Sequence, residues 1–387
     1  MKQYKHEIIR AMDEAVAGGR HSCAAVAVYQ HGEEKLRYAC GMADMERRRP
    51  ADEHSIYRLY SLTKPMTAVA AMALLEAGKL DACAPVKDYL PGFAKPMVAV
   101  GDTLVPANRD ILVRDLFSMT SGLVYPGDSN VADRAMAKLF DRWMDSRAAG
   151  EPMDTYAFVN EMGKQPLLFQ PGARWQYGVS ADVLGGVMEV ASGRKLDALL
   201  NELIFAPLGM RDTGFFVPAE KRERLTTLYE LRDGALAPFP GMHLAVGDYD
   251  TPPRFCSGGA GLVSTLPDVL RFARMLLNRG ELDGERVISP RAIDYMTAEH
   301  LTDAQHASFD WDSLQGYGYG VLVRTLLNPG MNFSLGSLGE FGWDGWTGPY
   351  MTVCPADDLT LVLMQQRTGS GVTELTRQVR NILFGRG

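Results

Sequence analysis

Segments with the pattern of β-strands lie at both ends of the chain, and a long, mostly helical stretch separates them. Near the start, "CAAVAVYQ" and "KLRYACGMAD" are typical of two strands joined by the turn His31-Gly32-Glu33-Glu34. Late in the chain, three further strands are expected in "YGYGVLVR", "GPYMTVCP" and "LTLVLMQQR". These hairpin signals favour an antiparallel sheet built from both ends of the chain, with the helical stretch forming a second lobe.

The two ends of the chain also carry amphipathic helices. Their apolar residues recur at helical spacing: Ile8, Ile9, Met12 and Val16 near the start, and Leu375, Val379, Ile382 and Leu383 near the end. We therefore predict an α+β fold, in which an antiparallel β-sheet is flanked by the terminal helices and a mostly helical lobe is inserted. The predicted sheet lobe covers residues 1–65 and 251–387, and the helical lobe covers 66–250. Two such lobes commonly form a cleft, and Ser61 stands at their junction.

The composition limits the class of protein. The 387 residues are 46% hydrophobic and 22% charged, which is ordinary for a globular chain with a large core. A net charge of −7 without any Lys/Arg block argues against nucleic acid as a partner. The start of the chain is charged throughout, unlike a secretory signal, and no apolar run approaches the roughly 20 residues of a membrane span. The five cysteines are dispersed without a C-x-x-C pair, so we predict reduced thiols in a cytoplasmic protein that does not bind membranes.

The stretch "YSLTKPMTAVAAMALLEAGKL" places Ser61 and Lys64 one helical turn apart, at the start of an otherwise apolar helix. One interpretation is structural: Ser61 caps the helix and Lys64 lies exposed in the first turn. The other is chemical: Lys64 lies beside the Ser61 hydroxyl and takes its proton. The chemical interpretation requires the lysine pKa to fall from about 10.4 to near 7, which costs roughly 4–5 kcal/mol and needs burial or a neighbouring positive charge. The motif alone does not decide, because an S-x-x-K pair arises easily by chance.

Five blocks in the chain, taken in order, resemble the serine β-lactamase-like superfamily, which also contains D-alanyl-D-alanine peptidases. They are "YSLTKPMTAVAAMALLEAGKLD", "ILVRDLFSMTSGL", "QPGARWQYGVSADVLGGVMEVASG", "CSGGAGLVSTLPDVLRFARMLLNRGELDGERVISP" and "GEFGWDGWTGPYMTVCPADDLTLVLMQQ". The likeness is greatest to class C β-lactamases and family VIII carboxylesterases, and it covers one catalytic unit, residues 20–387. The resemblance implies that Ser61 is a nucleophile that forms an acyl-enzyme, with Lys64 as general base.

The family's second motif is a tyrosine followed two residues later by asparagine or serine. Here Tyr177 supplies the tyrosine, but Val179 stands at the second position. By the resemblance, Tyr177 acts as general acid and shares the proton transfer with Ser61 and Lys64. A nearby Lys64 cation would favour the Tyr177 phenolate.

The family's third motif, a lysine or histidine on a strand lining the site, is missing near the C-terminus, because the last lysine is Lys221 and the last histidine is His306. The matching block "GWDGW" resembles the W-G-G form of family VIII esterases, with Asp344 in place of a small residue. The resemblance implies that Trp343 replaces the lysine and that Gly345 lets the substrate approach the strand. It also implies that the backbone N–H groups of Ser61 and Trp346 form the oxyanion hole. Asp344 would repel an anionic substrate if its side chain faces the site.

These replacements favour a neutral substrate, since Trp343 and Val179 stand where lactam-recognising members hold a carboxylate and an amide. We therefore predict a serine hydrolase, most simply a carboxylesterase on short-chain esters, with no metal or organic cofactor. Alternatives of the same fold are a β-lactamase, a D-amino-acid peptidase or amidase, and an acyltransferase; an alternative of another class is a non-catalytic penicillin-binding-like sensor. No G-x-S-x-G or H-E-x-x-H motif supports another hydrolase chemistry, and the loop residue His243 is a candidate for lining the cleft. The natural acyl and leaving groups and the oligomeric state stay open.

Overall fold

An eight-stranded antiparallel sheet forms the centre of the computed structural model, which describes residues 2–247 and 249–386. The strand order is β12-β13-β14-β15-β16-β1-β2-β3. The strands near the start of the chain are β1 (Cys23–Gln30), β2 (Glu33–Asp44) and β3 (Arg49–Pro50). Those near its end are β12 (Tyr317–Tyr319), β13 (Arg324–Leu326), β14 (Phe341–Asp344), β15 (Tyr350–Cys354) and β16 (Leu359–Gln365). The two ends of the chain meet where β1 pairs with β16, so the predicted fold class is confirmed.

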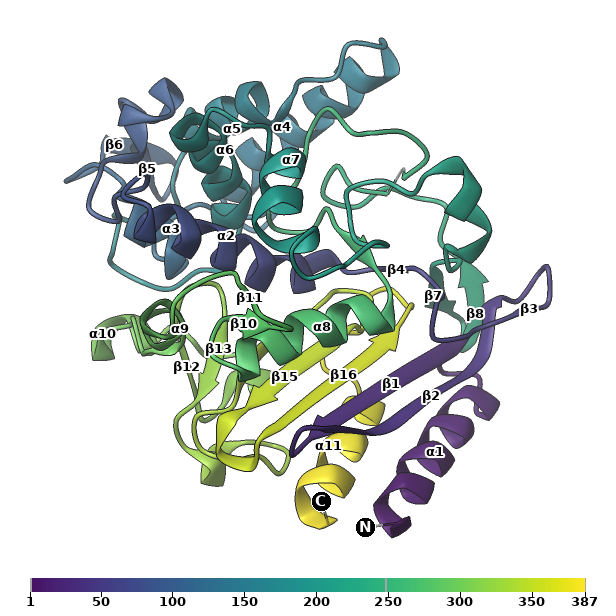
Figure 1. Ribbon diagram of the computed structural model, residues 1–387. Coiled ribbons are helices and arrows are strands. Elements are labelled where there is room, and N and C mark those ends of the chain that lie inside the picture. The colour runs from purple at the N-terminus through teal and green to yellow at the C-terminus, as the bar shows by residue number, and fades with distance from the viewer. Residues whose placement is uncertain (1, 248, 387) are drawn as a thin grey trace.

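Helices cover both faces of this sheet (Figure 1). Helices α1 (Lys2–Ala17) and α11 (Glu374–Arg386) lie together on one face, and α8 (Leu266–Leu277) crosses the other. Strand β1 serves both layers, because successive side chains point to opposite faces: Val26 packs in the cluster with α1 and α11, whereas Ala25 and Ala27 pack in the cluster with α8. This double burial explains why β1 is apolar throughout instead of alternating with polar residues.

Two local features of the sheet test the strand predictions. The predicted hairpin between β1 and β2 is confirmed, but its turn is only His31-Gly32, with left-handed φ values of 51° and 77°, because Glu33 and Glu34 already pair within β2. The single strand predicted for "YGYGVLVR" is wrong, because the segment folds back on itself as β12 and β13. The reversal is closed by the hydrogen bond from Gly320 N to Val323 O, 2.9 Å, and Gly320 is required there because a Cβ atom would lie 2.1 Å from Met296 O.

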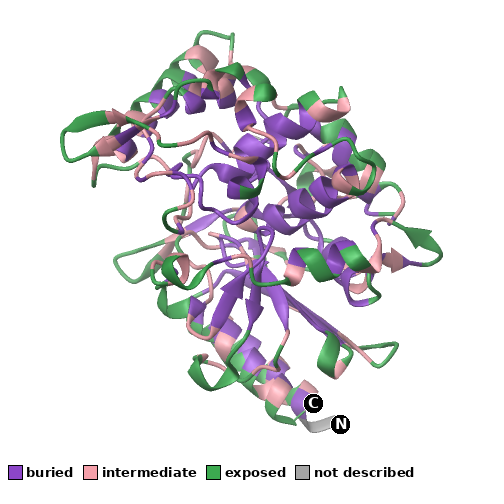
Figure 2. Cartoon of the chain, turned by 90° about the vertical axis from the view of Figure 1, so that its left-hand side faces the viewer, coloured by how far each residue is buried: buried purple, intermediate pink, exposed green. Residues whose placement is uncertain are grey.

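The inserted stretch is mostly helical, and it forms the upper part of Figure 1. Its helices are α2 (Lys64–Glu76), α3 (Val113–Phe117), α4 (Val131–Ala148), α5 (Thr155–Gly163), α6 (Ser180–Ser192) and α7 (Leu196–Leu200). Two small hairpins interrupt it: β5 (Met97–Val100) with β6 (Thr103–Pro106), and β7 (Tyr229–Arg232) with β8 (Ala235–Pro238). Buried residues run from α2 and α6 into β14 and β16 as one apolar cluster, and Figure 2 shows this buried zone passing between the two parts. The helices and the sheet therefore share a core.

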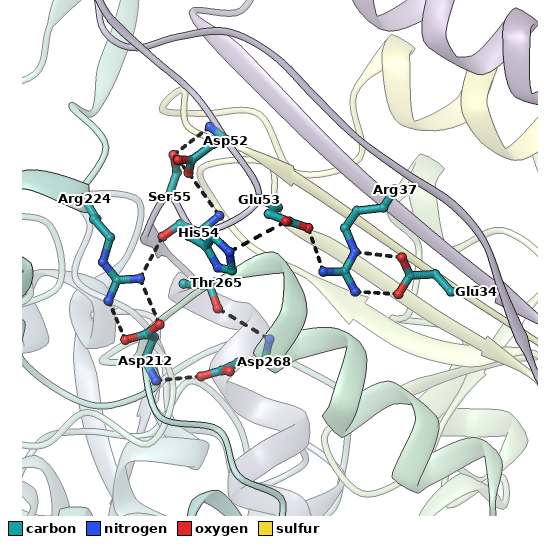
Figure 3. Close-up of polar contacts among 10 residues, drawn as sticks. All are labelled: Glu34, Arg37, Asp52, Glu53, His54, Ser55, Asp212, Arg224, Thr265 and Asp268. Atoms are coloured by element: carbon teal, nitrogen blue, oxygen red, sulfur yellow. Dashed lines mark hydrogen bonds and ion pairs between the residues drawn. The ribbon is translucent and has the colours of Figure 1, made fainter.

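Polar contacts anchor the segment that leads to the short strand β4 (Tyr57–Arg58) and then to Ser61 (Figure 3). The Arg224 guanidinium donates to the His54 carbonyl oxygen, 3.1 Å, and to both carboxylate oxygens of Asp212, 2.9 and 2.6 Å. The backbone N–H of Asp212 donates in turn to Asp268 at the start of α8, 2.8 Å. The chain that carries Ser61 is thus tied to the helix that covers the sheet.

The remaining helices, α9 (Pro290–Thr297) and α10 (Asp303–His306), flank β12. None of the helices in residues 2–247 and 249–386 has the length and apolar character needed to cross a membrane. The cysteines Cys23, Cys40, Cys83, Cys256 and Cys354 are free thiols, as predicted.

Candidate active site

Ser61 lies in a short 3₁₀ turn, Tyr60–Thr63, that runs directly into α2. The preceding residue, Tyr60, has a left-handed φ of 45°, which costs a bulky residue about 1–3 kcal/mol and persists only where the surroundings enforce it. Ser61 is half-buried and forms part of the wall of a cavity between the helices and the sheet. A strained backbone conformation next to a cavity-lining hydroxyl is typical of a functional site.

Lys64 has no exposed surface and belongs to the first turn of α2. Its Nζ donates to Ser61 Oγ at 3.1 Å, to Tyr125 OH at 3.0 Å and to the Gly259 carbonyl oxygen at 2.9 Å. Burial lowers the pKa of Lys64 to about 7, against smaller opposing effects of the Asp182 and Asp344 carboxylates. The interpretation of Lys64 as an exposed first-turn residue is therefore excluded. The capping interpretation also fails, because Thr63 is the N-cap residue of α2 and Ser61 Oγ contacts Lys64 instead.

The three neighbours of Lys64 determine what happens when it loses a proton. The Gly259 carbonyl oxygen can only accept, so it keeps one N–H of Lys64 in either protonation state. The lone pair of a neutral amine must then point to the hydroxyl of Ser61 or Tyr125, which are the two neighbours able to donate. A neutral Lys64 is thus placed to accept the Ser61 proton.

Tyr177 lies on the other side of Lys64, with its ring centroid 4.5 Å from Nζ. The indole Nε1 of Trp343 donates to its hydroxyl at 3.0 Å, which fixes the orientation of the phenol. Burial raises the pKa of Tyr177 well above its ordinary value. This direction is opposite to the lowering that a nearby Lys64 cation would cause, and it favours the protonated phenol that a proton donor needs.

Tyr125 is a second tyrosine at the site, and the sequence analysis missed it. It follows α3 in a loop whose stretch "SGLVYPG" carries no motif that marks a tyrosine as functional. Its hydroxyl contacts Lys64 Nζ, its ring packs edge-on against Tyr177 at 5.6 Å, and burial raises its pKa strongly. The one available signal was a tyrosine in a turn-rich segment beside a recognised block.

Asp182 is another residue that the sequence analysis passed over. It is buried in the first turn of α6, where its Oδ1 accepts from the Gly259 backbone N–H at 3.1 Å and from the Ser257 hydroxyl. Asp182 thereby positions the peptide whose carbonyl oxygen binds Lys64. A carboxylate inside the apolar run "SADVLGGVMEV" was the signal that could have found it.

The cavity beside Ser61 has a volume of about 400 Å³. Of the residues predicted for the site, Ser61, Tyr177, Trp343, Asp344 and Trp346 line it. The other lining residues are Trp311, Ser313, Leu314, Arg324, Gly369, Ser370, Gly371 and Val372.

Three rings pack against Trp346, among them Phe239, which lies edge-on at 5.7 Å. His243 stacks on the Trp346 ring at 4.1 Å, and Tyr60 packs edge-on against it at 5.0 Å. His243 is not among the cavity-lining residues, so its contact with the site runs through Trp346. The loop histidine thus supports the wall and does not form it.

Two predicted substrate-binding residues lie elsewhere. Val179 is fully buried in the apolar core ahead of α6 and does not line the cavity. Gly345 serves chain packing, because a Cβ atom there would lie 2.1 Å from the Leu59 carbonyl oxygen. Gly345 therefore lets the β14–β15 turn approach the chain just before Ser61. A glycine is needed at this position for that packing, and not for the predicted approach of a substrate.

The cavity holds a cation although the lysine of the family's third motif is missing. Arg324, at the start of β13, lines the same cavity and forms an ion pair with Asp344. A missing lysine therefore does not mean a missing positive charge. The positive charge of Arg324 is balanced by the neighbouring Asp344 carboxylate.

The site thus brings together a serine, a buried lysine and two tyrosines whose pKa values are raised by burial. The model of the Beta-lactamase family matches residues 8–384, so the chain belongs to that family.

Individual relatives cover nearly the whole chain. Protein Rv1367c of Mycobacterium tuberculosis is 34% identical over 367 residues, which is 91% of this chain and 88% of that protein. Esterase EstB of Burkholderia gladioli is 32% identical over 395 residues, covering 97% and 93% of the two chains. Among solved structures, EstCE1, described as a hydrolase with promiscuous acyltransferase activity, superposes with a TM-score of 0.83 at 24% identity and covers 99% of both chains. The fold is therefore that of EstCE1, and the relatives of the chain include Esterase EstB and a putative D-alanyl-D-alanine carboxypeptidase of Escherichia coli, which is 26% identical over 348 residues.

Proposed function

We propose that this protein is a carboxylesterase that hydrolyses short-chain esters through an acyl-enzyme on Ser61. The observation that carries the proposal is the fully buried Lys64 amine, 3.1 Å from Ser61 Oγ, with a pKa of about 7. A lysine with its ordinary pKa would stay protonated and could not activate a serine.

The reaction starts when neutral Lys64 takes the Ser61 proton and Ser61 Oγ attacks the ester carbonyl carbon. The backbone N–H groups of Ser61 and Trp346 stabilise the oxyanion. In support of this pairing, Gly345, just before Trp346, packs closely against Leu59, two residues before Ser61. The leaving alcohol takes a proton from Tyr177, which recovers it from the Lys64 ammonium. Water then repeats the sequence and releases the acid.

The cavity supports a small, neutral substrate. Trp343 and Trp346 are among its walls, and its volume of about 400 Å³ suits a short acyl chain. The relationship to Esterase EstB points the same way. We place the protein in the cytoplasm, in keeping with its free thiols.

Substitution of the nucleophile tests the proposal. Ser61→Ala should abolish hydrolysis of p-nitrophenyl butyrate while the melting temperature stays within a few degrees of the wild type, because Ser61 is only half-buried. A fluorophosphonate probe should label the wild type at Ser61 and leave the variant unlabelled. The distant Ser146→Ala, whose hydroxyl donates to the Trp143 carbonyl oxygen at the end of α4, is the matched control and should keep full activity. More than about a tenth of the wild-type rate in Ser61→Ala would refute the assignment, since loss of a nucleophile costs several orders of magnitude.

Acyl transfer is the second candidate function, and the similarity to EstCE1 favours it. An alcohol such as methanol, added during ester turnover, would then yield the transesterified product in excess of the acid. Hydrolysis of a β-lactam or a D-amino-acid peptide is expected to be feeble beside ester hydrolysis. A folded wild type that neither labels nor turns over any of these substrates would instead indicate a non-catalytic sensor.

A further inference from the structure

The Arg324–Asp344 ion pair in the cavity wall neither gives nor takes a proton in the steps described above, and its effect on them is limited to the small opposing influence of Asp344 on the Lys64 pKa. We propose that Asp344 masks Arg324 as a carboxylate-binding group, so that the site selects neutral esters and gains affinity for carboxylates when Asp344 is removed. This inference rests on the proposed ester hydrolysis and adds a specificity determinant to it.

The sheet register brings the two side chains together. Arg324 pairs with Gly342 across β13 and β14, and Asp344 lies two residues further along β14. Residues two apart on a strand share a face, so both side chains point to the same side of the sheet. The Arg324 Nη1 group donates to Asp344 Oδ1. Among the described residues, Asp344 is the carboxylate within ion-pair distance of Arg324.

Aromatic rings hold the Arg324 guanidinium independently of Asp344. Its central carbon lies 5.2 Å from the ring centroid of Trp343, 5.4 Å from that of Tyr317 and 5.3 Å from that of Tyr350. Guanidinium groups bind carboxylates well because they present several N–H donors in a fixed plane. Arg324 is therefore a preorganised carboxylate receptor that is occupied by a carboxylate from its own chain.

The two side chains of the Arg324–Asp344 ion pair differ in how far they are exposed. The Arg324 side chain is 3% exposed and Asp344 is 19% exposed, so the anion is the more accessible member of the pair. An incoming carboxylate meets the Asp344 charge before it meets Arg324. A second cavity of about 530 Å³ also has Arg324 in its wall, and it shares Trp311, Ser313 and Val372 with the first, so there is room beside Arg324 for a substrate group.

Two esters of equal chain length test the proposal: p-nitrophenyl pentanoate and mono-p-nitrophenyl glutarate, which differ by a terminal carboxylate. In Asp344→Ser, the ratio of kcat/KM for the glutarate ester to that for the pentanoate ester should rise at least tenfold over the wild type. Asp344→Glu keeps the charge and should leave the ratio near the wild-type value. The double variant Asp344→Ser/Arg324→Met should return it to that value. An unchanged ratio in Asp344→Ser, or a raised ratio that persists in the double variant, would overturn the proposal.

A binding measurement separates this proposal from the esterase assignment. Glutarate is titrated calorimetrically into Ser61→Ala and into Ser61→Ala/Asp344→Ser, with binding expected for the second protein only. Equal binding, or none in either, contradicts the masking of Arg324. Asp344→Asn replaces the serine variant if the latter does not fold. If the wild type hydrolyses neither ester, the proposed function fails, while the titration still decides the role of Asp344.

Discussion

Lys64 Nζ lies 3.1 Å from Ser61 Oγ although the Lys64 side chain has no contact with bulk solvent. The amine donates hydrogen bonds to Tyr125 and Gly259, and the Asp182 and Asp344 carboxylates oppose the effect of burial on its pKa only in part. Desolvation therefore acts on the ammonium with little compensation. The free energy spent on burying this group lowers the Lys64 pKa to about 7, so that near neutral pH a large share of the amine is neutral and able to accept a proton.

The rate of ester hydrolysis should depend on pH through Lys64. Because the neutral amine is the active form and its pKa is about 7, kcat/KM should rise about tenfold per pH unit below 7 and level off above it. The measurement is kcat/KM for a neutral ester between pH 5 and 9. His243→Gln is the control, since His243 also belongs to the site's surroundings. An inflection that disappears in His243→Gln would assign it to the imidazole instead.

Lys64→Met should abolish activity and change how stability depends on pH. The folded-state pKa of about 7 lies below the unfolded value of about 10.5, so the unfolded state binds more protons between these values and wild-type stability rises with pH there. Below pH 7 the buried cation costs the fold about 5 kcal/mol, at about 1.36 kcal/mol per pKa unit. Relative to the wild type, the variant should thus be more stable at pH 6 than at pH 10 by about 4 kcal/mol, because about three pH units of the span from the folded to the unfolded pKa lie between the two measurements. Denaturant unfolding at the two pH values measures the difference, and parallel pH dependence of the two proteins would contradict the lowered pKa.

The contact between Trp343 Nε1 and the Tyr177 hydroxyl predicts coupled effects on kcat. Tyr177→Phe should lower kcat by about 10²–10⁴-fold through loss of a proton donor. Trp343→Phe keeps an aromatic wall but removes the indole donor, and we expect a loss of roughly tenfold, as for one hydrogen bond of about 1 kcal/mol. In the Tyr177→Phe background the second change should have no further effect on kcat. Additive losses would show that Trp343 acts independently of Tyr177.

Gly345→Ala should damage both stability and activity. The added methyl group would lie 2.1 Å from Leu59 O, so the β14–β15 turn or the chain before Ser61 must move. We expect a loss of about 1–3 kcal/mol in the free energy of unfolding and at least a tenfold fall in kcat. Gly214→Ala is the matched control, because the nearest atom to its Cβ position lies 3.8 Å away. Full activity of Gly345→Ala would show that the β14–β15 turn does not determine the geometry of the proposed oxyanion hole.

The sheet, the terminal helices and the Ser61–Lys64–Tyr177 group were predictable because periodicity and ordered motifs are local properties of a sequence. The β12–β13 reversal was not, since it depends on the backbone of Met296 excluding any residue but Gly320. Tyr125 and Asp182 act through Lys64 and Gly259, which lie far from them along the chain. Such contacts depend on how distant segments pack, and local patterns in a single sequence do not reveal that packing. The Arg324 charge was missed for the same reason, because the pairing of β13 with β14 brings it to the cavity.

The position of β1 between β2 and β16 has a consequence for biosynthesis. Strand β1 ends at Gln30, whereas β16 begins only at Leu359, so one edge of β1 stays unpaired until the ribosome has made the chain through β16. Trp343 also emerges late, so a nascent chain with Ser61 and Lys64 already outside the ribosome lacks part of the cavity wall. The yield of active enzyme should therefore respond to chaperone supply and translation speed more than to the stability of the finished fold.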